Sequence, residues 1–357
     1  MRGFPSESQG VYYAGAPIGD DADDDPTRPI HMPELPDIVA YLEALTPRVV
    51  GRRIRDVRIV SPFVLRTVHP PVEAFAGQRV TDLRRIGKRI VFGCDAELFL
   101  IVHLMIAGRL RWLEGGAKPP ARITLASIAF DDEPRRDLAT APGSTIAERR
   151  ADTADAADGG DDPQGPVLAL TEASPKKRAA LHIVRGEAAL RAHDPGGVDV
   201  LACDEPAFAA ALRRENHTLK RALTDPRILD GIGNAYSDEI LHAAGMSPLQ
   251  LTQRLSAEDV ADLLAAARRT LTHWIAELRR KFAGRFPGAG EITAFRPGFA
   301  VHGRFGEPCP ACGTPVQRIR YAESETNYCP RCQTGGRLLA DRSLSRLLKD
   351  DWPRTID

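Results

Sequence analysis

Apolar residues near the start of the chain recur at the spacing of a helix. The stripe consists of Ile38, Leu42, Leu45 and Val49. Residues three or four positions apart lie on one face of a helix, so this spacing predicts one amphipathic helix with a buried side. Pro36 precedes the stripe and falls in the first turn, where its missing amide costs no hydrogen bond.

The following hundred residues change to short apolar runs that are separated by turns. Runs in which apolar and polar residues alternate are typical of half-buried strands. We predict strands at residues 53–60, 80–86, 89–92, 98–104, 122–130, 167–171 and 179–184. Successive short strands of this kind favour an antiparallel sandwich or barrel.

After about residue 200 the pattern becomes helical again. Short helices are predicted at 204–214, 216–223 and 235–244, and a long helix follows Ser256, a good capping residue. The long helix carries a single apolar stripe, which we interpret as core: Val260, Leu263, Leu264, Ala267, Leu271, Trp274, Ile275 and Leu278. Strands followed by helices predict an α+β protein.

Charge is unevenly distributed along the 357 residues, although the formal net charge is zero. Residues 1–31 hold six acids and two bases, and residues 131–165 hold ten acids and four bases, which leaves +10 on the remainder. A basic remainder is compatible with nucleic-acid binding. Both acidic segments lack apolar periodicity. We therefore expect 1–31 to be a disordered or wrongly assigned extension and 131–165 to be a disordered insertion.

Four of the six cysteines form two pairs near the end of the chain: Cys309, Cys312, Cys329 and Cys332. Two Cys-x-x-Cys pairs with sixteen residues between them can bring four thiolates around one zinc ion, with the intervening stretch forming a hairpin. Two disulfides or four buried thiols are the alternatives. Four protein ligands leave no open position, so the sequence predicts one structural Zn²⁺. Cys94 and Cys203 are isolated, and we interpret them as core or surface thiols.

Pro33 and Glu34 directly follow Met32. In the chain as written, Pro33 is an internal tertiary amide and cannot act as a nucleophile. If translation begins at Met32 and that methionine is then removed, or if processing removes everything before Pro33, the protein gains an amino-terminal secondary amine. An amino-terminal amine has a pKa of about 8, so part of it is neutral and nucleophilic near neutral pH. The alternative is structural, because Pro and Glu are also common in the first turn of a helix.

Two glycines lie in the turn at residues 229–234, between two predicted helices. Glycine permits a tight turn, and the first amides of the next helix can bind an anion such as a phosphate. Lys220 and Asn234 lie beside this turn and favour contacts with a nucleic-acid backbone. A simple corner between two helices is the alternative.

Together these segments resemble the formamidopyrimidine-DNA glycosylase and endonuclease VIII family of bacterial base-excision repair enzymes. The resemblance extends from Met32 to Gln333. It includes Met-Pro-Glu-Leu-Pro at 32–36, Arg-Arg-Ile-Gly-Lys at 84–88, His-Leu-Met-Ile-Ala-Gly at 103–108, the segment 216–245 and the four cysteines. Membership implies an amino-terminal antiparallel β-sandwich with an amphipathic helix, a helix-two-turns-helix domain and a carboxy-terminal zinc hairpin.

The resemblance also implies domain limits. We expect a catalytic sandwich domain at 33–201, a helix-two-turns-helix domain at 202–298, a zinc finger at 299–336 and a tail at 337–357. The tail has spaced leucines that predict a short helix packed on the rest of the protein.

The family mechanism assigns roles to the residues that match its motifs. Pro33 would attack C1′ of the damaged nucleoside and form a cationic iminium, and Glu34 would protonate the sugar ring oxygen. Base loss would be followed by strand scission through β- and then δ-elimination. Lys88 matches a hairpin lysine that approaches the phosphate and the lesion. Its alternative role is a solvated charge at the tip of a hairpin.

DNA contacts are implied in the same way. Ile106 aligns with the side chain that fills the space left by a flipped base, and Met105 is next to it, although a core position is the alternative for both. Lys220 and Asn234 match residues that grip phosphates. Arg178 ends a basic segment that lacks the aromatic residue of the family's strand-wedging loop.

Departures from the family pattern leave the preferred lesion and the opposite base open. Ser324 stands where the zinc hairpin usually has an arginine, for which Arg318 or Arg320 is a candidate replacement, and residues 284–295 do not match the loop expected over 8-oxoguanine. We expect a monomer that binds double-stranded DNA with damaged bases or abasic sites in the bacterial cytoplasm, at the nucleoid. A catalytically silent DNA-binding protein, and a zinc module for RNA or protein, are the alternatives.

Overall fold

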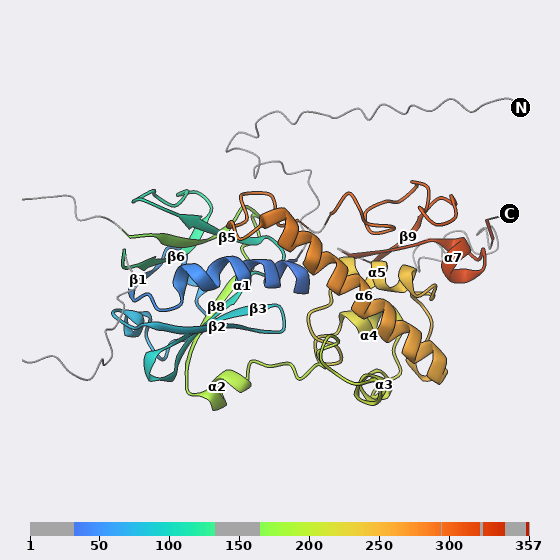
Figure 1. Cartoon of the computed structure of the whole chain (residues 1–357), viewed down its shortest axis with the longest axis horizontal. Coiled ribbons are helices and arrows are strands. Elements are labelled where there is room, and N and C mark those ends of the chain that lie inside the picture. Colours follow the sequence, from blue (N-terminus) through green and yellow to red (C-terminus); the bar gives the residue numbers. More distant parts are fainter. Residues whose placement is uncertain (1–31, 133–164, 294, 322–323, 340–354, 357) are drawn as a thin grey trace, which may run out of the picture.

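A computed structural model gives the fold (Figure 1). It describes residues 32–132, 165–293, 295–321, 324–339 and 355–356. The predicted extension at 1–31, nearly all of the predicted insertion at 131–165 and most of the predicted tail at 337–357 lie outside the described residues.

The chain first forms a helix, α1 (Leu35–Val49), and then two antiparallel four-stranded sheets. One sheet has the order β1-β6-β7-β5, with strands at Ile54–Ile59, Thr124–Phe130, Val167–Glu172 and Gly108–Leu113. The other has the order β2-β3-β4-β8, with strands at Val80–Ile86, Arg89–Cys94, Leu98–His103 and Ala180–Arg185. Short 3-10 helices occur at Pro62–Val64, Val72–Phe75 and Asp95–Glu97. The predicted sandwich is confirmed.

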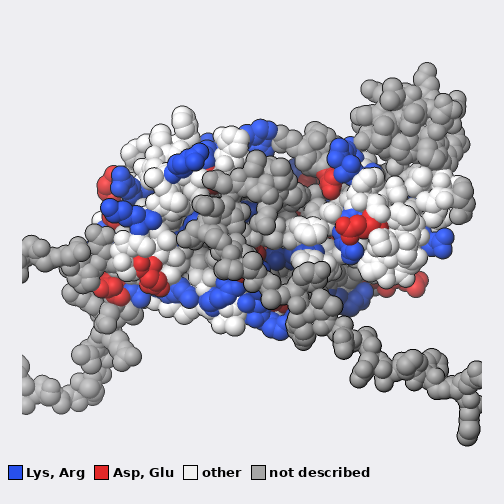
Figure 2. Space-filling view, turned by 90° about the horizontal axis from the view of Figure 1, so that it is seen from above, with Lys and Arg blue, Asp and Glu red and all other residues white. Residues whose placement is uncertain are grey.

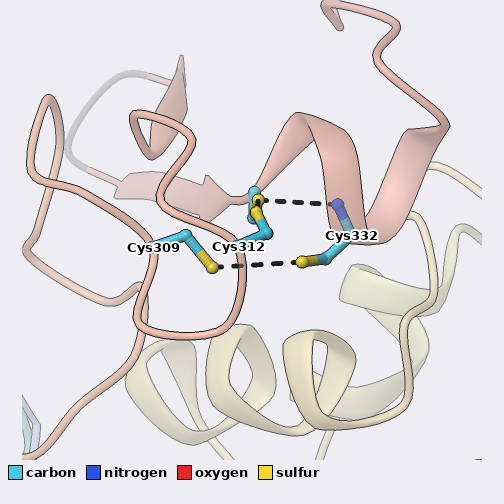
Figure 3. Close-up of side chains that lie close together, drawn as sticks. Cys309, Cys312 and Cys332 are labelled. Carbon is cyan, nitrogen blue, oxygen red and sulfur yellow. Dashed lines mark hydrogen bonds between the residues drawn. The ribbon is translucent and has the colours of Figure 1, made fainter. Parts of the chain in front are cut away.

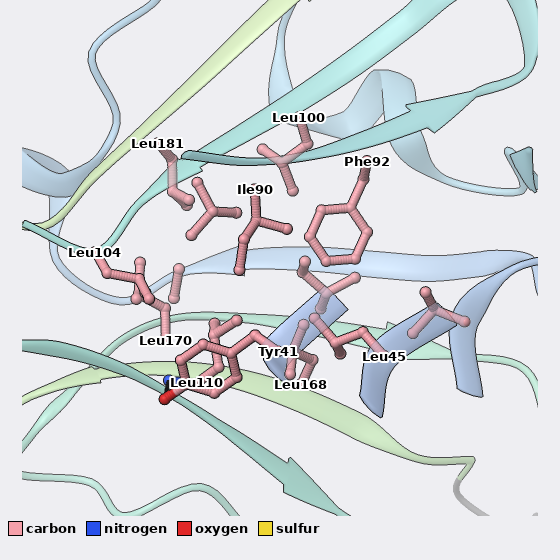
Figure 4. Packing of buried hydrophobic residues seen from close by; sticks show 14 of the residues in the cluster. Tyr41, Leu45, Ile90, Phe92, Leu100, Leu104, Leu110, Leu168, Leu170 and Leu181 are labelled. Atoms are coloured by element: carbon pink, nitrogen blue, oxygen red, sulfur yellow. Dashed lines mark hydrogen bonds between the residues drawn. The ribbon is translucent and has the colours of Figure 1, made fainter. Parts of the chain in front are cut away.

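The inner faces of the two sheets and one side of α1 meet in a single apolar core (Figure 4). Every second side chain of a strand points to this face, which is why Ile90 and Leu100 of one sheet meet Leu110 and Leu168 of the other. Tyr41 of α1 is buried among them, and its hydroxyl accepts a hydrogen bond from the amide of Leu110 at 3.3 Å. The helix therefore closes one side of the sandwich.

Two elements of this region were not predicted. Strand β5 does carry an alternating pattern, in which Arg109 and Arg111 alternate with Leu110 and Trp112, and this is the signal that identifies it. Helix α2 (Glu187–Arg191) has only five residues. It is too short for its apolar residues to show a period.

The helical region follows, with α3 (Glu205–Arg213), α4 (Leu219–Thr224), α5 (Asn234–Ala243), a 3-10 turn at Thr252–Arg254 and α6 (Ala257–Phe282). These helices enclose a second apolar core that includes Phe208, Tyr236, Leu263 and Phe299. Helix α4 begins three residues later than predicted, because Thr218 caps it by accepting a hydrogen bond from the amide of Arg221 at 3.4 Å.

The long helix α6 joins the two regions (Figure 1). Ser256 caps it as predicted, since its Oγ accepts from the amide of Asp259 at 3.0 Å. Its 26 residues correspond to about 39 Å, and they pack against both α1 and α5. The predicted apolar stripe is buried, except that Trp274 stays partly exposed. In the described ranges, no helix combines the length and the apolar character that a membrane span requires.

The two cysteine pairs flank a hairpin, as predicted. Strands β9 (Gln317–Tyr321) and β10 (Ser324–Tyr328) pair antiparallel, and the short helix α7 (Pro330–Thr334) follows. Strand β10 packs against α5. The hairpin is therefore held against the helical region.

Candidate active site and zinc centre

The carboxylate of Glu34 is buried at the start of α5. The amides of Gly233, Ala235 and Tyr236 donate to it at 2.6, 2.8 and 3.3 Å. Glu34 directly precedes α1, and its own amide donates to Oδ2 of Asp37 at 2.9 Å. The first amides of α5 thus hold the carboxyl group of Glu34 from the same chain, whereas the turn led us to expect an anion such as a phosphate.

Two glycines permit this close approach. A Cβ at Gly233 would lie 2.5 Å from Cδ of Glu34, and one at Gly231 would lie 2.8 Å from Cβ of Leu35. Gly231 also has a φ of +81°, which residues with side chains rarely adopt. Its carbonyl accepts a hydrogen bond from the amide of Leu35 at 2.9 Å. The turn before α5 and the start of α1 therefore interlock.

Lys88, at the turn between β2 and β3, lies close to Glu34. Its Nζ donates to the carbonyl of Ile232 at 3.1 Å. Burial lowers the pKa of Lys88, against the charges of Glu34 and Asp230. Burial raises the pKa of Glu34, against the charge of Lys88 and the amide of Ala235. Both groups are therefore shifted towards their neutral forms, as expected for titratable groups held away from water.

Arg85 anchors the hairpin that carries Lys88. Its guanidinium pairs with the carboxylates of Asp199 and Asp230, on either side of α3 and α4 in the chain. Asp230 also lies against Gly87, where an added Cβ would be 3.3 Å from its Oδ1. The hairpin tip is thus fixed to the turn that holds Glu34.

A buried ion pair supports the backbone of Glu34. Asp37 of α1 pairs with Arg296, and Nε of Arg296 also donates to the hydroxyl of Tyr236 at 3.2 Å. The side chains of Asp37 and Arg296 are only 2% and 5% exposed. Because Asp37 accepts the amide hydrogen of Glu34, this pair restrains the residue that follows Pro33.

Pro33 itself lies in the non-helical segment before α1 and is buried, after the partly exposed Met32. Its nitrogen is part of the peptide bond to Met32 in the chain as written. A free amine at this position therefore requires cleavage of that bond, whether translation begins at Met1 or at Met32.

One end of the sandwich collects several of the residues singled out by the sequence. The connection from β4 to β5 carries Met105 and Ile106, and the connection from β7 to β8 carries Arg178. Because β5 pairs with β7 and β4 pairs with β8 in antiparallel register, both connections leave the sheets at the same end. The pairing of β3 with β4 brings Lys88 to this end as well. It is the end at which Lys88 approaches Glu34.

The side chains of Met105, Ile106 and Arg178 are all partly exposed there. Met105 has a φ of +53°, a left-handed conformation that is uncommon for residues other than glycine. The amide of Arg178 is held by the buried carboxylate of Glu172, at 2.8 and 3.0 Å from its two oxygens. Both connections are thus shaped by specific backbone contacts.

Lys220 and Asn234 lie together at the start of α5, but Lys220 is paired within the protein. Its Nζ donates to the carbonyl of Asn234 at 2.7 Å and to Oδ1 of Asp238 at 2.6 Å, and its side chain is 12% exposed. Burial alone would raise the pKa of Asp238, but Lys220 and His302 outweigh it and hold the pKa below its ordinary value. Asn234 is partly exposed.

The four paired cysteines converge, as predicted (Figure 3). Their sulfur atoms all lie within 4.8 Å of one another, with Cys309 and Cys332 at 4.0 Å and Cys312 and Cys329 at 3.4 Å. A tetrahedral site with Zn–S bonds of about 2.3 Å has sulfur separations of about 3.8 Å, whereas a disulfide requires about 2.05 Å. The spacing and the all-thiol donor set fit one structural Zn²⁺ and exclude disulfides between these four.

Three family profiles match the chain in this order. The formamidopyrimidine-DNA glycosylase N-terminal domain matches residues 32–141, the formamidopyrimidine-DNA glycosylase H2TH domain matches 197–281, and the zinc finger found in FPG and IleRS matches 306–335. A formamidopyrimidine-DNA glycosylase of Thermobifida fusca is 32% identical over 312 residues, which cover 85% of this chain and 97% of that protein. The chain belongs to the formamidopyrimidine-DNA glycosylase family.

Two further comparisons bear on this glycosylase-family chain. A protein of Mycobacterium tuberculosis, described as an uncharacterized formamidopyrimidine-DNA glycosylase-like protein, is 41% identical over 160 residues, which cover 44% of this chain and 96% of that protein. The Lactococcus lactis Fpg in complex with abasic-site DNA superposes with a TM-score of 0.66 at 21% identity, covering 84% of this chain and 99% of that one. At that identity the likeness shows the fold alone.

The sequence analysis did not identify the polar residues that connect the sandwich, the helical region and the zinc finger of this family member. Asp37 was detectable, because an acid three residues after a helix cap is a capping signal. Arg296 and Asp238 gave no such signal, since their partners are far away in the chain. Glu239 is a further example: it accepts hydrogen bonds from the amides of Ala300, Val301 and His302 at 2.7 to 2.9 Å, ahead of the first cysteine pair.

Basic side chains lie along the edges of one face of the molecule. Figure 2 shows Lys and Arg side chains along much of the rim of the face seen from above, with fewer Asp and Glu side chains among them. This distribution agrees with the positive charge expected for the part of the chain outside the two acidic segments.

Proposed function

We propose that this protein is a base-excision repair DNA glycosylase with abasic-site lyase activity, which removes oxidised bases from double-stranded DNA. The observation that carries the proposal is the buried carboxylate of Glu34, next to Pro33 in the chain and close to Lys88. Membership in a family of DNA glycosylases and the basic rim support it. The Lactococcus lactis protein of the same fold was solved with abasic-site DNA.

In the proposed reaction, the amine of Pro33 attacks C1′ and displaces the base. Glu34 protonates the ring oxygen as the sugar opens to a cationic iminium. Loss of the C2′ proton then expels the 3′ phosphate, and a second elimination expels the 5′ phosphate. The raised pKa of Glu34 suits a general acid, and burial lowers the pKa of Lys88, which increases its neutral fraction.

DNA would lie across the end of the sandwich that carries Lys88. We propose that Met105 or Ile106 fills the space of the flipped base and that Arg178 contacts the opposite strand. Asn234 and Lys220 would contact phosphates, although Lys220 would have to share its charge with Asp238. The sandwich (33–201), helical (202–298) and zinc-finger (299–336) divisions and a monomeric state belong to this proposal.

A second candidate function is lesion binding without catalysis. It is favoured by the peptide bond between Met32 and Pro33 in the chain as written, which leaves no amine at Pro33. The family's amino-terminal profile begins at residue 32, which supports a functional start at Met32 instead. The two candidates differ in one covalent step and can be separated by it.

Borohydride trapping tests that step. Protein that begins at Pro33 is mixed with an oligonucleotide containing an abasic site, reduced, and examined for a covalent complex, beside its Pro33→Gly variant and the full 357-residue form. We expect a trapped band from the Pro33 form, a much weaker band from the glycine variant, and none from the full chain. Folded, zinc-loaded protein that binds the DNA without trapping would refute the lyase and leave the binding function.

A further inference from the structure

A histidine of the helical region contacts the zinc site. Nε2 of His242, in the last turn of α5, lies 3.3 Å from Sγ of Cys309. We propose that His242 donates a hydrogen bond from Nε2 to the zinc-bound thiolate of Cys309, and that it thereby acts as a positioning residue that stabilises the zinc centre and ties it to α5.

The direction of this hydrogen bond follows from the chemistry of the donor set. A cysteine that binds zinc is a thiolate, which can only accept. The ring nitrogen that faces it must therefore carry the hydrogen, so the contact selects the Nε2–H tautomer. Four thiolates around one divalent ion leave a formal charge of −2, and each donated hydrogen bond reduces the electron density on sulfur. The amide of Cys332 supplies another such contact, to Sγ of Cys329 at 3.5 Å.

The position of His242 on α5 gives the contact a second consequence. Residues four apart lie on the same side of a helix, so His242 shares a face with Asp238. Asp238 accepts from the amide of Asn327 in β10 at 3.0 Å and pairs with His302 at 2.8 Å. Helix α5 therefore contacts the zinc finger through Asp238 at the hairpin and through His242 at the first cysteine turn, in addition to the contacts of Glu239 at 300–302. The contact of His242 is the one of these that reaches a zinc ligand directly.

A purely packing role for the ring is the competing explanation, and a neighbouring histidine allows the two to be compared. His242 lines a hollow of about 270 Å³ between α5 and α6, together with His273 and Trp274. The ring of His273 packs edge-on against Trp274, with ring centroids 5.4 Å apart. Both histidines thus line the same hollow, His242 partly buried and His273 exposed, but the contact with Cys309 belongs to His242.

The test compares zinc retention in full-length, zinc-loaded proteins at pH 7.5. His242→Gln keeps an N–H donor, His242→Met has a similar length without one, and His273→Met is the matched control. Release of zinc to a coloured chelator should be about 10- to 100-fold faster in His242→Met, within about 3-fold of wild type in His242→Gln, and unchanged in the control. In the cobalt-substituted proteins, the thiolate charge-transfer band should shift in His242→Met alone. Equal release from all four proteins, or equal losses in the Gln and Met variants, would overturn the proposal.

A second measurement needs no variant, and it decides the question if His242→Met does not fold. Long-range proton–nitrogen NMR spectra of the cadmium-substituted wild-type protein report which ring nitrogen of each histidine carries hydrogen. We expect the Nε2–H form for His242, with a measurable coupling from that hydrogen to ¹¹³Cd. The Nδ1–H form would refute the hydrogen bond, whatever the variants show.

Discussion

Gly233 is the position at which the shape of the site can be tested with the smallest change. Its φ is −131°, which any residue adopts, so alanine at this position meets no backbone strain. The added methyl group would instead lie 2.5, 2.7 and 2.9 Å from Cδ, Oε1 and Cγ of Glu34. Carbon atoms do not approach this closely, and the carboxylate must therefore leave the first amides of α5.

The cost can be worked from the hydrogen bonds that are lost. The contacts to Gly233 and Ala235, at 2.6 and 2.8 Å, are broken first. A buried donor left without a partner costs about 1–3 kcal/mol, so the two together cost about 4 kcal/mol. The smaller conformational entropy of unfolded alanine offsets this by less than about 1 kcal/mol. We expect Gly233→Ala to reduce the free energy of unfolding by about 3 kcal/mol.

A double-mutant cycle shows whether the clash with Glu34 is the cause. Urea unfolding of the zinc-loaded protein, followed by tryptophan fluorescence, is compared for wild type, Gly233→Ala, Glu34→Ala and the double variant. The Glu34→Ala change removes all three atoms that the new methyl group would strike. In that background Gly233→Ala should cost less than about 1 kcal/mol. If the two single losses simply add, the interlocking of α1 and α5 does not depend on this contact and the reasoning is wrong.

Three further changes test other parts of the structure. Arg296→Met should lower the free energy of unfolding in urea by about 3–5 kcal/mol, because it leaves the buried carboxylate of Asp37 unpaired. Adding Asp37→Asn should recover part of that stability, and no recovery would argue against the ion pair. Burial and neighbouring positive charges lower the pKa of His103 to about 4 in the folded protein. In the unfolded chain the His103 imidazole has its ordinary pKa of 6.5 and takes up a proton below that pH, whereas in the folded protein it stays neutral. The free energy of unfolding therefore falls as the pH drops from 6.5 towards 4. The fall between pH 7.5 and 5 should therefore be about 2 kcal/mol smaller in His103→Asn, and an identical fall in both proteins would contradict the burial of a neutral ring. Cys312→Ser should no longer bind one zinc ion per protein and should have a lower melting temperature, because the site loses a ligand. The control Cys203→Ser should keep one zinc ion per protein in metal analysis. One zinc ion per protein in Cys312→Ser would place the ion elsewhere.

The elements of this fold were readable from the sequence where burial follows a short period. The strands of the sandwich were readable as short apolar runs bounded by turns, and in β3 and β4 these runs are continuous because both faces are buried. Helix α6 carries a stripe because one of its sides packs against both regions. The cysteine pairs and the glycine turn were readable because their chemistry restricts the spacing. The cysteines converge as predicted. The turn holds the carboxyl group of Glu34, and its binding of an external anion stays a prediction.

Long-range polar contacts could not be predicted in the same way. Asp37 and Arg296 are separated by 259 positions, and Glu34 and Gly233 by 199. A carboxylate that pairs with a distant arginine has the same local pattern as one that faces water, because its partner leaves no mark within a helical turn. Only the tertiary arrangement shows that these acids are buried and satisfied.

Helix α5 shows how polar contacts that the local sequence pattern does not reveal can hold the parts of the site together. Its middle reads Ser-Asp-Glu at 237–239, a polar sequence typical of an exposed helix, yet all three residues are buried. Burying such groups is unfavourable unless each forms hydrogen bonds, and here each does. Ser237 donates to the carbonyl of Gly233, and Asp238 accepts from Lys220 and from the zinc hairpin. Glu239 accepts from the amides at 300–302. The first amides of the same helix hold Glu34. A helix of ten residues therefore connects the sandwich, the helical region and the zinc finger through polar contacts that specify one arrangement, which an apolar helix of equal length would not do.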